Sequence, residues 1–383
     1  MTPSFNHSNA TIWKINDTTL RDGEQMPGVF FSEDNKIEIC EQLLSIGIND
    51  IEVGCAPLLN KDTKFVQYLS HHPEKERFSV WCRATQSDVE DALRLGFNKI
   101  HVSIPVSDFQ LGHMDKSRTW AMKTTQQLIS FLRRHVPFIS VGAQDATRSD
   151  LDFLINFLDI LDFFKVKRFR FSDTVGIAMP GHIAAMSTRL RNHFNGDIEF
   201  HGHNDLGLAT ANCIAALQHG STEVSTTISG IGERAGNASL EQVACAIQYG
   251  LHNQTDILLS ELQPICEYVS QCARVPISPN QPITGKLAFS HESGVHYSGQ
   301  LKHPLMYQPF DAEDVGRESE LVLGRHSGSS AICDVLQKKG IPISRQYART
   351  LIKQLQRLYP QKGTYELNDL LHTLSVYSHT QAN

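Results

Sequence analysis

The segment His201–Asp205, which reads HGHND, places two imidazole groups two residues apart. It follows a short run, Asp197–Phe200, whose pattern predicts a strand. Residues i and i+2 of a strand face the same side, so His201 and His203 can bind one ion. In a chain with 18 histidines one such pair arises easily by chance, and ordinary packing histidines are the plainer interpretation. The metal-site interpretation therefore depends on what the rest of the chain places beside the pair.

The composition is that of a soluble globular protein, with 40% hydrophobic and 20% charged residues and a net charge of −6. No basic patch predicts nucleic-acid binding, and no apolar run approaches the roughly 20 residues that cross a bilayer. Residues 1–9 lack the basic start and apolar middle of a signal peptide, so we expect a cytoplasmic protein. Eight cysteines without a C-x-x-C pair indicate buried free thiols rather than a zinc finger or a disulfide framework.

Up to about residue 250, short apolar and β-branched runs alternate with longer amphipathic stretches. Eight such alternations predict a (β/α)8 (TIM) barrel. A doubly wound open sheet would have fewer strands and a glycine-rich phosphate turn after the first, and the chain shows neither. The predicted strands are Ile12–Asp17, Asp50–Gly54, Phe78–Arg83, Lys99–Pro105, Phe138–Gly142, Arg168–Ser172, Asp197–His201 and Glu223–Ser229.

The pattern changes after about residue 251, where prolines at 264, 276, 279 and 282 mark a transition. We predict a catalytic barrel domain over residues 1–275 and a smaller C-terminal helical extension over residues 276–383. Two helical stretches are expected in the extension, near Ser330–Lys339 and Ser344–Leu358.

In a barrel of this kind the active site lies where each strand meets the loop that follows it. Polar residues of this chain gather at those places, and Asp22, His201 and His203, with Asn237, form an O/N ligand set compatible with Mn²⁺, Mg²⁺, Zn²⁺ or Co²⁺. Taken alone, Asp22 is better explained as a turn cap in Arg-Asp-Gly. Arg21 is either a surface residue or, beside a metal, a group that stabilises negative charge on oxygen. The other positions are Glu52, Arg83, Ser107, Asp108, Gln144, Asp145, Asp173, Thr174 and the segment 230–237.

With these residues assembled, the chain resembles the metal-dependent Claisen-condensing enzymes that include 2-isopropylmalate synthase, citramalate synthase and homocitrate synthase. The likeness spans roughly residues 12–330. Within the family, the segments 102–108 and 141–145 and the compact length are most similar to the nitrogenase-cofactor type of homocitrate synthase. The segments that carry the likeness are 17–25 (DTTLRDGEQ), 172–176 (SDTVG), 201–208 (HGHNDLGL), 230–237 (GIGERAGN) and 291–296 (HESGVH).

The resemblance implies a role for each matching residue of the barrel. Asp22, His201 and His203 are the implied metal ligands, and Asn237 is a fourth ligand or a near neighbour. The implied metal is Mn²⁺, Mg²⁺ or Zn²⁺. Arg21 is expected to polarise the ketone of the substrate and to steady the developing alkoxide. In the same way, Thr174 is expected to hold the substrate carboxylate.

For the C-terminal region the resemblance implies a lid that contributes to a homodimer. His296 and Tyr307 match a His and a Tyr that reach the partner subunit's active site and act in proton transfer, whereas packing within a helical lid is the plainer alternative. About 100 residues follow the barrel, too few for a leucine-binding regulatory domain as well, so feedback control through such a domain is not expected.

The implied reaction is a condensation of acetyl-CoA with a 2-oxo dicarboxylic acid, 2-oxoglutarate, followed by thioester hydrolysis to homocitrate and CoA. Phosphonopyruvate and 2-oxoisovalerate are alternative substrates. A barrel that has lost catalysis and serves as a binding or regulatory protein is an alternative of another class. A retro-aldol lyase is disfavoured because residues 285–328 match the condensing branch.

The chain departs from the family pattern at position 144, where the resemblance implies a glutamate that assists enolisation. Gln144 cannot accept a proton at ordinary pH. Either His296 is the base alone, or Asp145 has taken the role, or the reaction is slow or altered. Asp145 is the weaker candidate, since neighbours on a strand face opposite sides.

A second departure concerns the far carboxylate of the substrate. Lysine-pathway homocitrate synthases bind it with a His and an Arg, and Ser79 and Ser140 stand at the matching positions. Neither serine supplies a charge, and the nitrogenase type shares this lack. Recognition is therefore expected from Arg83 or from the loop Ser103–Gln110, although Arg83 is equally explained as a structural residue of the barrel.

Overall fold

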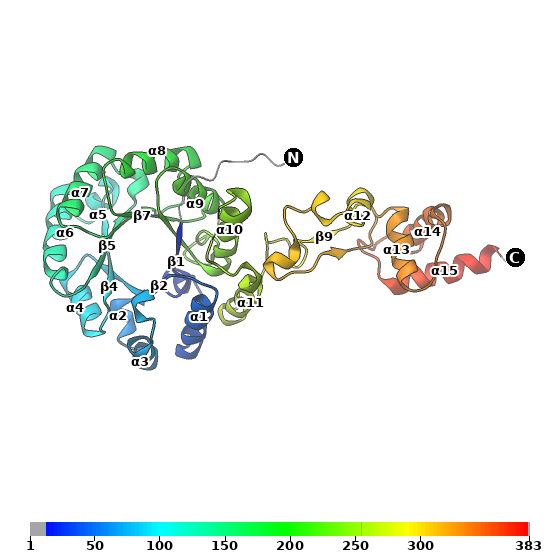
Figure 1. Cartoon of the computed structure of the whole chain (residues 1–383), viewed down its shortest axis with the longest axis horizontal. Coiled ribbons are helices and arrows are strands. Elements are labelled where there is room, and N and C mark those ends of the chain that lie inside the picture. The colour runs from blue at the N-terminus through cyan, green and yellow to red at the C-terminus, as the bar shows by residue number, and fades with distance from the viewer. Residues whose placement is uncertain (1–12, 254, 382–383) are drawn as a thin grey trace. The chain divides into compact units, whose positions relative to one another are not determined.

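Eight parallel strands close into a barrel in the computed structural model, which describes residues 13–253 and 255–381. Each strand pairs with its neighbour in the sequence, and β1 pairs with β8 to close the ring. Helices surround the strands (Figure 1), so the predicted (β/α)8 fold is confirmed. The strands are β1 (Lys14–Asp17), β2 (Asp50–Cys55), β3 (Phe78–Arg83), β4 (Lys99–Pro105), β5 (Phe138–Gln144), β6 (Arg168–Asp173), β7 (Asp197–Gly202) and β8 (Glu223–Thr226).

The strand bounds differ from the predicted ones mainly at their carboxyl ends. Strands β3 and β4 match the prediction residue for residue, and β5 runs on to Gln144. β8 ends at Thr226, because the chain turns into a 3-10 helix, Ile228–Gly230, in which Ser229 has φ 57°. The predicted start of the first strand at Ile12 lies outside the described residues.

Several helices of the barrel begin at a side chain that accepts a hydrogen bond from the first turn. At the start of α1, Ser32 Oγ accepts a hydrogen bond from the Asn35 backbone N–H, and Asn35 Oδ1 accepts one from the Ser32 backbone N–H, which satisfies both donors. The helices are α1 (Glu33–Ser45), α2 (Ala56–Leu59), α3 (Thr63–His71), α4 (Gln86–Arg94), α5 (Asp108–His113), α6 (Arg118–Leu132), α7 (Leu151–Phe163), α8 (Pro180–Arg191), α9 (Ala209–Gln218), α10 (Leu240–Cys245) and α11 (Leu262–Ala273).

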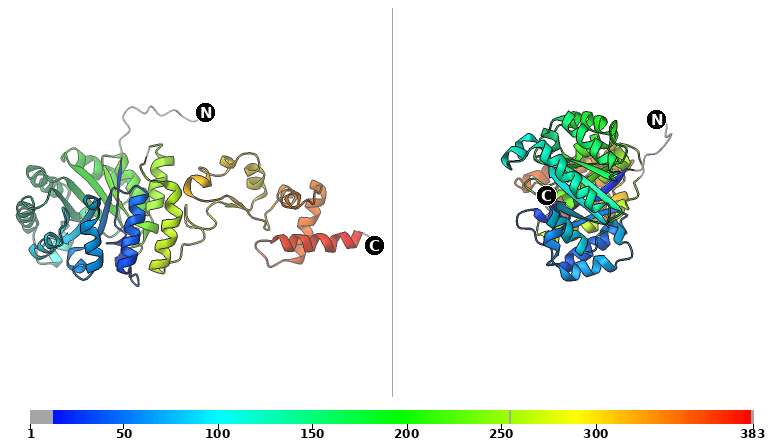
Figure 2. Two further views of the ribbon diagram at one scale, coloured as in Figure 1. Left: turned by 60° about the horizontal axis from the view of Figure 1, so that its bottom comes forward. Right: turned by 90° about the vertical axis from the view of Figure 1, so that its left-hand side faces the viewer.

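The chain divides into two compact units, Met1–Ile277 and Ser278–Asn383. The second unit has its own apolar core, which includes Tyr297, Leu336 and Leu351. The two helices predicted there are present as α13 and α14, and two more, α12 and α15, were not predicted; Figure 2 shows α15 in red. The elements of this unit are β9 (Ser290–His291), α12 (Gly294–Gln300), β10 (Glu320–Leu321), α13 (Ser329–Lys338), α14 (Arg345–Leu358) and α15 (Leu367–Gln381).

Two further observations concern the whole described chain. All eight cysteines are free thiols, as predicted, and five of them are buried. Among the residues that the structure describes, no helix combines the length and the apolar character needed to cross a membrane.

The interior of the barrel is charged rather than purely apolar. Alternate residues of a strand share a face, and on β6 both Arg168 and Arg170 are buried. Arg168 Nη1 lies 2.5 Å from Asp50 Oδ2 and 3.0 Å from Glu223 Oε2, while Arg170 Nη2 lies 2.8 Å from Glu52 Oε2. Buried charges of this kind are tolerated only when they are paired. The Arg168 pairs lie at the amino ends of the strands, whereas Arg170 lies further along β6 and lines a polar cavity toward the carboxyl ends.

Candidate active site

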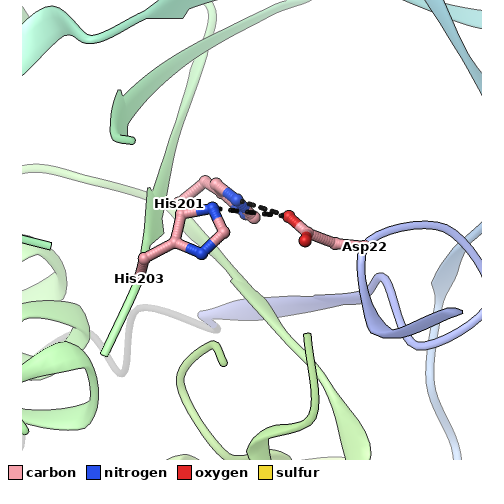
Figure 3. A group of neighbouring side chains, drawn as sticks. All are labelled: Asp22, His201 and His203. Carbon is pink, nitrogen blue, oxygen red and sulfur yellow. Dashed lines mark ion pairs between the residues drawn. The ribbon is translucent and has the colours of Figure 1, made fainter. Parts of the chain in front are cut away.

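Asp22, His201 and His203 meet at the carboxyl end of the barrel (Figure 3). Asp22 lies after β1, His201 lies near the end of β7, and His203 follows the last residue of β7. The Nε2 atoms of His201 and His203 lie 3.0 Å and 3.6 Å from Asp22 Oδ2. All three side chains are buried, and their candidate ligand atoms lie within 4.8 Å of one another. The structure thus brings together the three side chains that the sequence proposed as a metal site.

The chemistry of this cluster fits a divalent metal ion. Burial alone would raise the pKa of Asp22, but the Arg21 guanidinium and the two imidazoles hold it well below its usual range. Burial, with His201 beside it, lowers the pKa of His203 to about 4. An ionised carboxylate and a neutral imidazole are the forms that bind metals. The buried atoms Asp22 Oδ1, His201 Nδ1 and His203 Nδ1 also have no hydrogen-bond partner among the described residues.

Asn237, the predicted fourth ligand, lies beside the cluster. It forms an isolated β-bridge with His203, and its Nδ2 donates a hydrogen bond to the Ile231 carbonyl at 3.1 Å. Its Oδ1 is buried without a partner among the described residues. A Cβ built at Gly232 would lie 2.2 Å from Asn237 Nδ2, so position 232 needs glycine to leave room for the side-chain amide of Asn237. Asn237 therefore remains a predicted ligand or neighbour.

Arg21 links the metal cluster to the charged interior of the barrel. Its Nη1 donates a hydrogen bond to Asp22 Oδ2 at 3.0 Å, and its Nε donates to Glu52. The guanidinium carbon also lies 5.7 Å from the centre of the Trp81 ring. Burial would raise the pKa of Glu52, but Arg170 and Arg21 hold it at about 2, so Glu52 is an anion that fixes both arginines. Arg21 is thus rigidly placed beside the cluster, as its predicted role requires.

A cavity of about 230 Å³ opens beside these residues. Ser103, the first residue of the loop from which substrate recognition was predicted, lines the cavity, and three further polar lining residues were not predicted from the sequence, namely His101, Arg170 and Ser172. Their signal was available, because each is a polar residue on the inward face of a strand that is otherwise apolar. The lining residues are Arg21, Asp22, Gln25, Trp81, His101, Ser103, Gln144, Arg170, Ser172, Thr174, His201, His203, Glu233 and Arg234.

Gln144 lines the cavity, whereas its neighbour Asp145 does not. The Asp145 carboxylate accepts hydrogen bonds from Ser107 Oγ at 2.6 Å and from Arg148 Nε at 2.7 Å, and the residue is fully buried. Asp145 also adopts a left-handed conformation with φ 57°, which turns the chain out of the strand. Asp145 is therefore held by structural partners and does not replace the missing glutamate.

Thr174, the predicted carboxylate-binding residue, lines the cavity from the end of β6. Its Oγ1 accepts a hydrogen bond from the Asp145 backbone N–H at 2.9 Å. Its carbonyl accepts a hydrogen bond from Arg234, whose guanidinium also contacts Asp205. These contacts fix the Thr174 segment at the mouth of the cavity.

The prediction that Arg83 binds substrate is not supported by its position. Its guanidinium makes two hydrogen bonds of 2.9 Å to Asp88, and its side chain is 64% exposed and does not line the cavity. Asp88 lies in the first turn of α4, and its buried carboxylate draws the arginine toward that helix. This position favours the structural interpretation of Arg83, whereas Arg170 is the barrel arginine that lines the cavity.

Ser79 and Ser140 also lie outside the cavity lining. Ser79 donates a hydrogen bond to Asp50 Oδ1 at 3.0 Å, and Ser140 Oγ lies 2.7 Å from His101 Nδ1. Both serines are fully buried within the barrel. Neither serine reaches the cavity itself, so direct recognition of a substrate must come from other residues.

His296 and Tyr307 lie together in the second unit. Their rings are stacked, with centroids 4.2 Å apart and planes 18° from parallel. A Cβ at Gly299 would lie 2.3 Å from Tyr307 Cε2, so this glycine lets the tyrosine ring approach α12. The two rings thus form a stacked pair, while their reach into a partner subunit stays a prediction.

Comparison with known proteins places these features in a family. The HMGL-like family model matches residues 13–269, and the model described as homocitrate synthase post-HMGL domain-like matches residues 283–363.

Curated relatives match over most of the chain. Homocitrate synthase of Frankia alni is 39% identical over 336 residues, covering 87% of this chain and 95% of the relative. 2-Isopropylmalate synthase 2 of Caldanaerobacter subterraneus is 36% identical over 345 residues, covering 90% of each chain. 2-Phosphonomethylmalate synthase of Streptomyces rubellomurinus is 36% identical over 331 residues, covering 85% of this chain and 88% of the relative. The chain therefore belongs to the HMGL-like family, among relatives named as homocitrate, 2-isopropylmalate and 2-phosphonomethylmalate synthases.

Proposed function

We propose that this protein is a divalent-metal-dependent synthase that condenses acetyl-CoA with 2-oxoglutarate and hydrolyses the thioester to give homocitrate and CoA. The buried cluster of Asp22, His201 and His203 beside Arg21 carries the proposal. One carboxylate and two imidazoles leave coordination positions open for a bidentate 2-oxo acid. The names of the relatives support the reaction class.

The residues of the cavity divide the chemical work. A divalent cation held by the cluster would polarise the keto group of a bound 2-oxo acid. Arg21 stabilises the negative charge that develops on the keto oxygen, and Thr174 holds the substrate carboxylate. The acetyl methyl group loses a proton to a base, its carbon bonds to the keto carbon as the carbonyl double bond opens, and the resulting alkoxide takes up a proton. Water then cleaves the thioester, which releases CoA and a new carboxylate.

The polar floor of the cavity favours a substrate whose far end is anionic. His101, Ser103, Arg170 and Ser172 line it, and the guanidinium of Arg170 there is paired with Glu52 and Glu199. An isopropyl group would leave these polar groups unsatisfied, which argues against 2-oxoisovalerate. Phosphonopyruvate is the second candidate, because it also carries an anionic far end and one relative is named 2-phosphonomethylmalate synthase.

Proton removal from acetyl-CoA falls to His296 with Tyr307 in this proposal. Asp145 is occupied by Ser107 and Arg148, and Gln144 cannot accept a proton. The stacked pair in the second unit is the remaining predicted acid–base group. A homodimer in which this pair serves the partner subunit's active site is part of the same proposal.

Replacing Gln144 with glutamate tests whether a missing carboxylate limits the rate. We expect Gln144→Glu to raise kcat about ten-fold, because a carboxylate at this wall would assist deprotonation of the acetyl group. Gln25→Glu is the matched control, since it adds a carboxylate elsewhere in the same cavity and should not raise kcat. An unchanged or lower kcat in Gln144→Glu would show that the amide does not limit the reaction.

The contact between Gly299 and Tyr307 offers a test of the acid–base pair. Gly299→Ala should push the Tyr307 ring away from His296 and lower kcat about ten-fold, while the dissociation constant for metal stays unchanged. Gly112→Ala is the control, because this helical glycine has open space around it. Full activity of Gly299→Ala, measured by CoA release, would show that the stacking of His296 and Tyr307 is not needed for catalysis.

A panel of substrates tests the proposed function as a whole. CoA release is followed with acetyl-CoA and 2-oxoglutarate, phosphonopyruvate or 2-oxoisovalerate under Mn²⁺, Mg²⁺ and Zn²⁺. We expect release with 2-oxoglutarate, its loss on chelation and its recovery when metal is returned. Preference for 2-oxoisovalerate would overturn the substrate assignment. No release with any acid would favour a non-catalytic binding role.

A further inference from the structure

The floor of the cavity holds a buried histidine whose two ring nitrogens have different surroundings. His101 is 1% exposed, and its Nδ1 lies 2.7 Å from Ser140 Oγ. Its Nε2 is buried and has no hydrogen-bond partner among the described residues, although the ring lines the cavity. A Cβ at Gly142 would lie 2.5 Å from this nitrogen, so the glycine keeps space open beside it. Buried polar atoms are normally satisfied, which makes Nε2 a candidate to contact a ligand.

The hydrogen bonds behind His101 determine which ring nitrogen carries the proton. Arg168 Nε donates to Ser140 Oγ at 3.1 Å, and an arginine N–H can only donate. The hydroxyl proton of Ser140 is therefore directed to His101 Nδ1. If His101 Nδ1 carried the proton and donated it to Ser140, the buried hydroxyl proton of Ser140 would have no acceptor among the described residues. Burial, and then the positive charge of Arg170, lowers the pKa of His101 well below its usual range, so the ring is neutral with its proton on Nε2.

We propose that His101 donates its Nε2–H to the far end of the 2-oxo acid, and that Ser140 is a positioning residue that fixes this tautomer. The inference rests on the proposed function and narrows its substrate class to 2-oxo acids whose far end accepts hydrogen bonds. Ser103 Oγ would lie 3.3 Å from the same Gly142 Cβ position, and Arg170 lines the same floor. An acceptor placed there meets two neutral donors and one cation, whereas an apolar end leaves the donors unpaired.

Ser140→Ala tests the positioning role by kinetics. We expect the KM for 2-oxoglutarate to rise about ten-fold with kcat changed less than about two-fold, because the donor is no longer fixed. The inhibition constant of 2-oxovalerate, whose far end is apolar, should change less than about two-fold. Ser79→Ala is the matched control, since Ser79 is equally buried but donates to Asp50 and not to His101. Equal effects on both acids, or the same effect in Ser79→Ala, would overturn the proposal.

A second readout does not depend on turnover. Nitrogen-15 NMR of the labelled protein, with the His101 signals assigned by their loss in His101→Gln, should show the proton on Nε2 and a shift toward the other tautomer in Ser140→Ala. A proton on Nδ1 of His101 in the unsubstituted protein would overturn the proposed role of Ser140 even if condensation is observed. Conversely, if no 2-oxo acid reacts, the proposed function fails, while the NMR result still decides whether Ser140 fixes the tautomer of His101.

Discussion

Asp22→Asn should lower kcat by about 100-fold or more and weaken metal binding at least as strongly. The amide of Asn lacks the negative charge with which Asp22, together with the two imidazoles, would bind a divalent cation. The fold should survive, because Arg21 keeps its contact with Glu52. Calorimetric titration with Mn²⁺ and Zn²⁺, together with CoA release, measures both effects.

Asp108→Asn is the control for this substitution. Asp108 lies at the same end of the barrel, but its carboxylate is exposed and paired with Arg118 outside the cavity. It should retain metal affinity and turnover. If Asp22→Asn binds metal as tightly as the unsubstituted protein, the cluster is not the metal site.

Arg21→Lys should lower kcat about 100-fold and leave metal affinity nearly unchanged. Lysine keeps the charge but lacks the planar fork that contacts Asp22 and Glu52 together. The developing charge on the keto oxygen would then lose an oriented donor. Steady-state kinetics with metal at saturating concentration isolates this effect.

Arg83→Lys provides the comparison, since Arg83 makes the same kind of forked contact with Asp88 outside the cavity. Its kcat and KM should stay within about two-fold of the original values. A raised KM for the 2-oxo acid in Arg83→Lys would restore Arg83 as a substrate-binding residue. Loss of metal affinity in Arg21→Lys would instead assign Arg21 to support of Asp22.

The fold was predictable because strand periodicity is a local signal. Strands β3 and β4 match their predicted bounds, and like most of the other strands they are short runs buried along nearly their whole length. The end of β8 was missed because the left-handed conformation of Ser229 is not encoded by a glycine. Helix α15 was missed because no pattern drew attention to the last residues of the chain.

Site residues were predictable where they lie at the ends of strands. They were less predictable where a side chain can pair with more than one neighbour in the folded structure. The metal cluster required only that β1 and β7 end at one rim of the barrel. The position of Arg83 outside the cavity was not predicted, because its ion pair with Asp88 depends on the folded structure and cannot be read from the spacing of residues in the sequence. Arg170 and His101 were overlooked because polar residues inside a barrel look anomalous until their partners are known.

The central claim is that this protein forms a carbon–carbon bond between acetyl-CoA and a 2-oxo acid. The most direct measurement follows methyl-labelled [2-¹³C]acetyl-CoA and 2-oxoglutarate by ¹³C NMR in the presence of Mn²⁺. The account predicts free CoA and a labelled methylene carbon in a new tricarboxylate, with no label left in a thioester. Labelled acetate as the sole product, or unchanged acetyl-CoA, would contradict it.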